Sequence, residues 1–76
     1  MKTIISTIVY LSDRTISIAI CERNDLYYIS VSCKYKTNSS LNSHHESDTY
    51  TIDKFDTVKN IYLNYIRHSL NIQSRN

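Results

Sequence analysis

Apolar and polar residues alternate in two neighbouring stretches of the chain, and a period of two is typical of strands with one buried face. The first stretch is residues 15–21 and the second is residues 26–36, with the polar segment 22–25 between them. The positions on the more apolar face are Ile16, Ile18, Ile20, Tyr27, Ile29, Val31, Cys33 and Tyr35. We interpret the two stretches as a β-hairpin whose turn lies at 22–25.

Residues 2–11 are also rich in β-branched and aromatic residues, but here apolar side chains occupy both faces. A strand of this kind is covered on two sides or pairs with another molecule. The stretch has the charge and apolar run of a short signal peptide, yet Asp13 and Arg14 follow it without a small-residue cleavage pattern. We therefore interpret it as the first strand of a cytoplasmic protein.

From residue 37 to residue 49 the chain is polar apart from one large apolar residue, Leu41. This composition predicts a mobile surface loop, and so long a loop in a small domain is either functional or disordered. Residues 49–52 are interpreted as a short fourth strand.

Helical periodicity begins after Asp53, which is a favourable N-cap residue. Over residues 54–71 one stripe of the helix surface is apolar: Phe55, Val58, Ile61, Tyr62, Tyr65, Ile66 and Leu70. The stripe predicts an amphipathic helix that packs on the sheet. Together the elements predict a single α+β domain over residues 1–76. Its fold is a three- to four-stranded antiparallel sheet (β-meander) with one C-terminal amphipathic helix packed on one face.

The composition excludes one large class of functions, because the 76 residues include no glycine and no proline. Loops that cradle phosphate groups need glycine so that their backbone can approach the phosphate, and nucleotide-binding loops of this kind are therefore excluded. Without glycine, longer loops are favoured over tight two-residue hairpin turns. Alanine occurs once, at Ala19. This bias against residues with G- and C-rich codons indicates an A+T-rich gene, which is typical of phages and mobile elements.

The two cysteines, Cys21 and Cys33, are predicted to be reduced thiols. In the predicted hairpin they lie about seven residue steps apart, or about 23 Å, whereas a disulfide needs Cα atoms within about 7 Å. Reduced thiols are typical of the cytosol.

The segment His44–Asp48 contains four residues that could ligate a metal ion. Structural zinc sites, however, set ligand pairs at fixed spacing on rigid turns, and a Ser-His-Asp catalytic set needs rigid support as well. The predicted loop offers no such support. We therefore predict no metal ion, no cofactor and no enzymatic activity.

The remaining signals indicate binding. Seven tyrosines are more than so small a core can bury with satisfied hydroxyls, so several should reach the surface as contact residues. We hypothesise a small non-enzymatic binding or inhibitor protein that occupies a surface of another macromolecule. Its origin would be a phage or mobile element, and its target host defence machinery, in the manner of anti-CRISPR or anti-restriction proteins. The expected partner is a host protein or nucleoprotein complex, without a membrane.

The predicted partner surface joins the polar face of the second hairpin strand to the following loop. Its residues are Tyr28, Lys34, Lys36, Asn38, His44 and His45.

Two alternatives remain open at this point. Aromatic and basic residues on an open sheet face bind nucleic acid in several modules, although nine basic residues are nearly balanced here by seven acidic ones. Lys34 and Lys36 also suit the role of protecting a sheet edge. The second alternative is a homodimer, formed through the first strand or through the sheet face that a single helix leaves uncovered.

Overall fold

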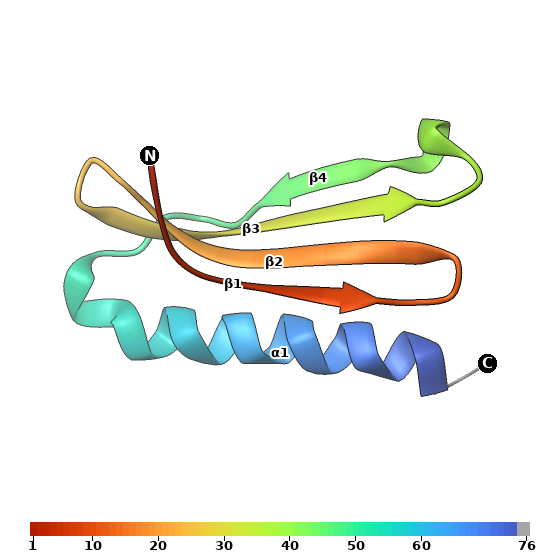
Figure 1. The fold of residues 1–76 in the computed structure, drawn as a ribbon. Coiled ribbons are helices and arrows are strands. Elements are labelled where there is room, and N and C mark those ends of the chain that lie inside the picture. Colours follow the sequence, from red (N-terminus) through yellow and green to blue (C-terminus); the bar gives the residue numbers. More distant parts are fainter. Residues whose placement is uncertain (75–76) are drawn as a thin grey trace.

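The computed structural model describes residues 1–74 and confirms the predicted α+β fold (Figure 1). Four strands form one antiparallel sheet in the order β1-β2-β3-β4. Their bounds are β1 Lys2–Tyr10, β2 Arg14–Arg23, β3 Leu26–Tyr35 and β4 Ser43–Glu46. The helix α1, Phe55–Ser74, packs on one face of this sheet, and two short 3-10 helices, η1 Ser39–Leu41 and η2 Ile52–Lys54, lie in the connections.

The hairpin between β2 and β3 turns more tightly than expected. Arg23 pairs with Leu26, so the loop consists of Asn24 and Asp25 alone. Both residues have positive φ, 55° and 62°. Left-handed backbone at both central residues defines the two-residue turn that matches strand twist, and Asn and Asp tolerate it better than other non-glycine residues. The expectation of a longer loop was therefore wrong.

The fourth strand lies at 43–46 and not at 49–52, inside the segment that was expected to be a mobile loop. Its backbone pairs with the outer edge of β3, from Ser30 opposite Glu46 to Cys33 opposite Ser43. Polar residues can form this strand because the pairing depends on backbone groups that β3 leaves free. In the predicted strand only Tyr50 makes a bridge, to Tyr27.

The helix begins slightly later than its predicted cap. Asp53 lies within η2, and the residue that caps η2 is Thr51, whose side chain makes no capping hydrogen bond. The Thr51 hydroxyl instead donates to the Asp53 carboxylate and holds the pKa of that carboxyl below its usual range. Asp53 is thus a first-turn acid of η2 and not the N-cap of α1.

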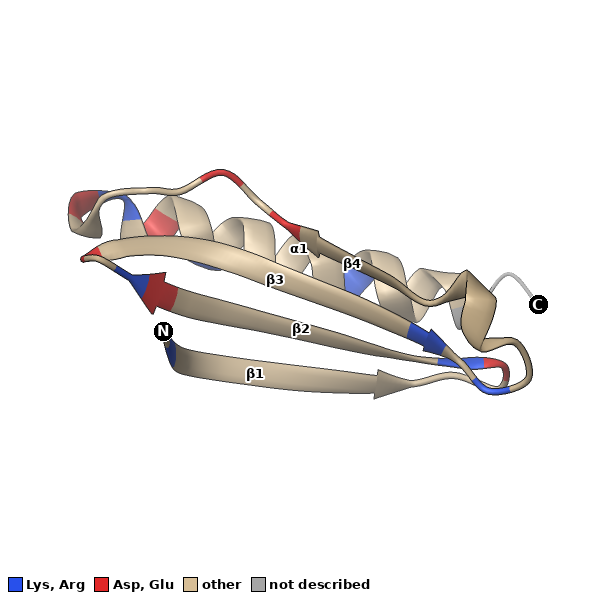
Figure 2. Ribbon diagram, turned by 90° about the horizontal axis from the view of Figure 1, so that it is seen from above, with Lys and Arg blue, Asp and Glu red and all other residues tan. Residues whose placement is uncertain are grey.

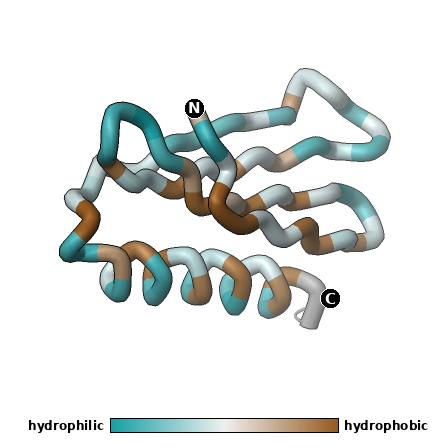
Figure 3. The backbone as a smooth tube through the Cα atoms, turned by 60° about the vertical axis from the view of Figure 1, so that its left-hand side comes forward, coloured by the Kyte–Doolittle hydropathy of each residue, from teal (hydrophilic) through white to brown (hydrophobic). Residues whose placement is uncertain are grey.

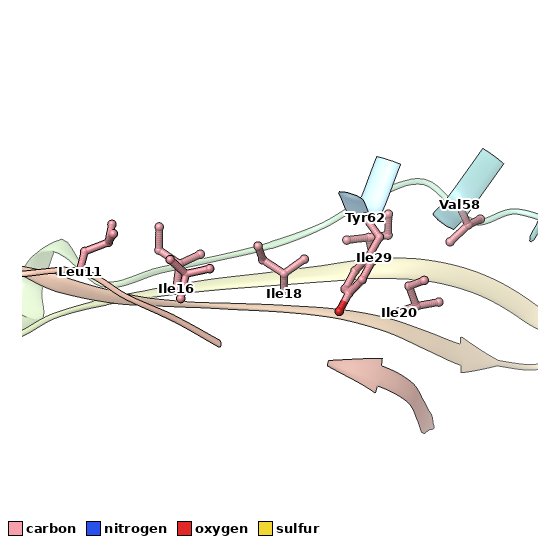
Figure 4. Packing of buried hydrophobic residues seen from close by; sticks show 8 residues of the cluster. Leu11, Ile16, Ile18, Ile20, Ile29, Val58 and Tyr62 are labelled. Carbon is pink, nitrogen blue, oxygen red and sulfur yellow. The ribbon is translucent and has the colours of Figure 1, made fainter. Parts of the chain in front are cut away.

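The core lies between the helix and the covered face of the sheet (Figure 4). Its buried residues are Val9, Leu11, Ile16, Ile18, Ile20, Ile29, Val58 and Tyr62. The isoleucines of β2 and the stripe of α1 thus behave as predicted, with one exception. Leu70 is 52% exposed, while Ser69 is buried and its hydroxyl donates to the Tyr65 carbonyl oxygen at 2.9 Å.

Cys21 and Cys33 are both free thiols, as the sequence predicted. Cys33 pairs with Ile16 and so lies on the helix-covered face, whereas Cys21 pairs with Tyr28 on the opposite face. The distance between the paired positions is five residues along β2, or about 17 Å, which is far beyond the reach of a disulfide. Within residues 1–74 no helix is both long and apolar enough to cross a membrane.

Candidate partner-binding edge

Strand β1 forms one outer edge of the sheet, with β2 as its single neighbour. Its outer backbone groups therefore lack a ladder partner within the described chain. Four large apolar residues of this strand are exposed to solvent. Their exposed fractions are 38% for Ile4, 50% for Ile5, 48% for Ile8 and 72% for Tyr10. Lys2 is the one charged residue in β1, and the strand is otherwise free of blue or red in Figure 2. In Figure 3 the tube is darkest brown in the first half of this strand.

Strand β1 is anchored to the rest of the domain, because it also contributes to the core. Val9 is 6% exposed and packs in the main cluster, and the Thr7 hydroxyl shares a hydrogen bond with the hydroxyl of Tyr62 on α1. The ladder to β2 is regular from Ile5 to Tyr10, while an irregularity lies between Thr3 and Ile5. Such a bulge twists an edge and discourages pairing. The regular, unprotected part of the edge is therefore residues 5–10.

Pairing with β2 assigns the exposed side chains of β1 to both faces. Ile8 and Tyr10 pair with Ser17 and Thr15, which lie on the face without a helix. Ile5 pairs with Ile20, which lies on the face with the helix. Apolar side chains thus flank the free backbone on each side, which is the arrangement a natural sheet edge normally avoids.

A groove runs between the edge and the helix. It has a volume of about 410 Å³ and is lined by Ile4, Ile5, Ile20, Phe55, Lys59, Tyr62 and Leu63. In the view of Figure 2, β1 does not overlap with α1, although the two elements are in contact through Thr7 and Tyr62. The helix-side face of β1 is only half covered. Lys59 is the only charged residue among the lining residues.

The predicted contact residue Tyr28 is buried, so the expectation that its ring is exposed on the sheet face was wrong. Its side chain is 1% exposed, even though it lies on the face without a helix. The Arg23 guanidinium covers the ring at 4.6 Å from its centroid, and Cys21 lies opposite it in the ladder. The Tyr28 hydroxyl has no nitrogen or oxygen partner within residues 1–74, and burial raises the pKa of this hydroxyl.

The other predicted contact residues are exposed but lie at different places. Lys34 pairs with Thr15 near the far end of β3, six residues from Tyr28, or about 20 Å along the strand. Lys36 follows β3, and its backbone N–H donates to the Asp13 carbonyl at 3.0 Å. Asn38 caps η1 by accepting from the Ser40 backbone N–H. The structure therefore groups the two lysines and Asn38 at one end of the sheet, apart from Tyr28.

The two predicted histidines lie in β4 and point to opposite faces. His45 pairs with Val31, whereas His44 pairs with Ser32 and is within hydrogen-bond distance of its hydroxyl, at 2.8 Å from Oγ to Nδ1. The other ring nitrogen of His44 is 3.6 Å from Glu46, which also approaches Arg23 at 3.5 Å. Among residues 1–74 no group of three or more metal-ligating side chains comes together.

Ser32, His44 and Glu46 follow one another in the order of a catalytic triad, a juxtaposition that the sequence did not reveal. The side chains of His44 and Glu46 are 54% and 40% exposed on an outer strand. A hydrolytic site also needs donors for an oxyanion and a cavity that holds the substrate. The groove beside β1 and a second hollow of about 290 Å³, lined by Ile61, Asn64, Tyr65 and His68, involve none of the three residues. The Ser32–His44 hydrogen bond ties β4 to β3 at the surface, and Glu46 lies beside His44 on the same strand.

The sequence indicated the first strand as a surface that could pair with a second copy, but its residues were not part of the predicted partner surface. The signal was present, since residues 2–11 are apolar on both faces. Which strand would be outermost, and where the helix would lie, could not be read from that pattern.

Comparison with known proteins does not indicate a function for this chain. No protein-family model, no curated protein and no solved structure matches this chain.

Proposed function

We propose that this protein is a non-enzymatic binding protein that contacts another macromolecule through the β1 edge. The observation that supports the proposal is the combination of unpaired backbone and exposed Ile5, Ile8 and Tyr10 along one regular strand. Strand addition at such an edge is a common mode of protein recognition. We replace the predicted surface around Tyr28 by this edge, because Tyr28 is buried.

The expected driving force is burial of apolar surface on both sides of the added strand. Each square ångström of apolar surface removed from water stabilises the complex by about 25 cal/mol before the cost of association. Backbone hydrogen bonds give the added strand its register, and the side chains of Ile8 and Tyr10 on one face and Ile5 on the other select its sequence. The edge of β4 has no comparable apolar residues, since all four of its positions are polar and exposed.

The amino-acid composition indicates an A+T-rich gene and so favours a phage or mobile element as its source. A host defence complex in the cytoplasm is therefore the partner class we propose to search first. Affinity purification with the full chain from host cells, followed by mass spectrometry, would provide candidates. The proposal is then tested with purified components and not with the extract.

The decisive variant is Ile8→Lys, which places a protective charge on the face without a helix and leaves the core intact. Leu41→Lys is its matched control, because Leu41 is similarly exposed, at 55%, but lies in η1. We expect Ile8→Lys to weaken binding of the purified partner at least about tenfold, which corresponds to about 1.4 kcal/mol. Leu41→Lys should bind like the unmodified chain. Equal affinity of all three proteins, measured by calorimetry, would overturn the proposal.

A second candidate function is nucleic-acid binding, and one observation still favours it. Tyr10, Thr15 and Lys34 are linked in one row across three strands, which places an exposed ring and an exposed ammonium group on the same open face. Such a pair can stack on a base and contact a phosphate. Mobility shifts with single- and double-stranded probes across a salt series test it, because phosphate contacts give steeply salt-dependent affinity. A shift at low salt that Tyr10→Ser and Lys34→Ser abolish would support it, and its absence would exclude it.

A further inference from the structure

We propose that the occupant of the β1 edge is an extended strand of a different protein, with apolar side chains toward the groove and a carboxylate beside Lys59. This inference rests on the proposed function and names the chemistry of the partner segment. It is carried by three features of the same place: the free edge, the groove and the charge of its lining.

The free edge determines the conformation of the occupant. Residues 5–10 form a regular strand with backbone groups directed away from β2. An extended segment is the form of chain that can satisfy donors and acceptors repeating at strand spacing. Six residues span about 20 Å at strand rise, so the bound segment has about that length.

The groove determines which side chains the segment carries. Side chains of an added strand alternate between the two faces of the sheet. Those that point to the helix side meet the groove of about 410 Å³, whose lining includes Ile4, Ile5, Phe55 and Leu63. Branched or aromatic residues at alternate positions fill such a space with favourable contacts.

The charge of the groove lining determines which polar side chain the bound segment carries. Lys59 lies in the groove and forms no ion pair with another residue of the described chain. Lys2 adds a second positive charge at the same end of β1 and faces Glu22 across the ladder. Asp56 lies one helical turn before Lys59 but is not part of the lining. A carboxylate in the occupant would complement this end of the groove.

The same charge argues against a second copy of this chain as the occupant. Strand β1 contains no acidic residue, and none lines the groove. In a dimer joined through β1, neither copy would bring an acidic residue of its strand or groove to the Lys59 of the other. Complementarity therefore favours a strand that differs in sequence from β1.

The test uses three nine-residue peptides in which valine and threonine alternate, flanked for solubility by polar linkers. They carry glutamate, serine or lysine near both ends, so that either strand direction presents the tested residue to Lys59. Affinity is measured by fluorescence anisotropy at low ionic strength for the full chain, for Lys59→Glu and for the matched control Lys54→Glu. Lys54 belongs to η2 and lies outside the groove lining.

We expect the glutamate peptide to bind about three- to fivefold more tightly than the serine peptide, with the lysine peptide weakest, as a partly exposed ion pair allows. Lys59→Glu should reverse this order and Lys54→Glu should preserve it. If the three peptides bind equally and Ile8→Lys abolishes this binding, the inferred preference for a carboxylate is wrong. The proposed function, binding at the β1 edge, would still stand.

Two further outcomes separate the inference from the proposed function. If no peptide binds while a purified partner binds in an Ile8-dependent manner, the extended strand is the wrong occupant although the edge is the right site. If light scattering shows a dimer that Ile8→Lys dissociates, the occupant is a second copy and the inference is overturned.

Discussion

The two outer strands of the sheet, β1 and β4, differ in nearly every property that governs edge pairing. Strand β1 has nine residues, one charge and four exposed large apolar side chains, three of them within its regular part. Strand β4 has four residues, all polar and exposed, and its side chains His44 and Glu46 lie close together. Short length and polar or charged side chains are the usual protection of an edge. The sheet is thus protected on one side and open on the other.

This difference indicates a division of roles. Strand β4 caps β3 and contributes no buried residue, whereas β1 is held firmly by Val9 and the Thr7–Tyr62 hydrogen bond. An apolar edge that core contacts already hold in place can bind an extended segment with less loss of its own entropy than a free segment would. The two edges should therefore respond differently to substitution.

The largest effect is expected on stability, from the buried side of β1. Val9→Ala removes two buried methyl groups from the core and should lower the free energy of unfolding by about 2 kcal/mol. The neighbouring Ile8→Ala and the β4 variant His45→Ala should each cost less than about 0.5 kcal/mol, as is usual for exposed sites. Urea denaturation measures all three. Equal losses from Val9→Ala and His45→Ala would show that β4 is as much a part of the core as β1.

The next effect concerns binding without any change in charge. The double variant Ile5→Thr with Ile8→Thr keeps β-branched residues on the strand but removes apolar surface from both sides of the edge. We expect about a tenfold weaker complex, or about 1.4 kcal/mol, with the purified partner. His44→Thr with His45→Thr makes the matched change on β4 and should leave affinity unchanged. A loss confined to the β4 variant would assign the site to the other edge.

A smaller effect on stability is expected at Tyr28. Its ring lies beneath Arg23 of β2, which pairs with Glu46 of β4. Tyr28→Phe removes a buried hydroxyl without a nitrogen or oxygen partner and should stabilise the fold by about 1 kcal/mol. Tyr10→Phe is the matched control, since Tyr10 is 72% exposed, and it should have no effect. Destabilisation by Tyr28→Phe would show that the Cys21 thiol or another group does pair with this hydroxyl.

The same residue predicts an alkaline pH dependence. Because burial raises the pKa of the Tyr28 hydroxyl, the unfolded chain loses this proton first as the pH rises. The free energy of unfolding therefore keeps its full value below about pH 10, the ordinary tyrosine pKa, and falls as the pH rises further. Tyr28→Phe should flatten the alkaline decline of the melting temperature more than Tyr10→Phe does. Identical alkaline curves for the two variants would contradict the assignment.

The smallest effect is expected from the ion pairs of β4. Glu46→Gln removes the partner of Arg23 at 3.5 Å and of His44 at 3.6 Å, but all three side chains are 40% exposed or more. Exposed pairs of this kind contribute less than about 1 kcal/mol, so we expect a loss below about 0.5 kcal/mol in urea. A loss several times larger would mean that β4 is fixed by these charges and not by its backbone ladder.

The sequence predicted the parts of the fold that depend on local periodicity. Ile16, Ile18 and Ile20 alternate into the core, and Val58 and Tyr62 anchor the helix as their spacing indicates. Strand β4 was missed because Ser43–Glu46 has no apolar pattern, and its strand form depends on the free edge of β3. The tight turn was missed because Asn24 and Asp25 can adopt positive φ without being glycine.

The site was harder to predict, because it depends on the order of strands and on the register between them. Alternation places Tyr28 on the polar face, and only the hairpin register brings Arg23 over its ring. The apolar residues on both faces of β1 were visible in the sequence, but the half-covered position of Ile5 depends on where α1 crosses the sheet. The proposed role in binding, and the class of partner, stay predictions.

Backbone hydrogen exchange on the purified complex tests the central claim most directly. Amide exchange is followed by mass spectrometry in the free protein and in the complex, with Leu41→Lys as the control. A strand added to β1 should slow exchange in residues 5–10 and leave β4 at residues 43–46 unchanged. Slowed exchange at β4 with an unchanged β1 would contradict the account.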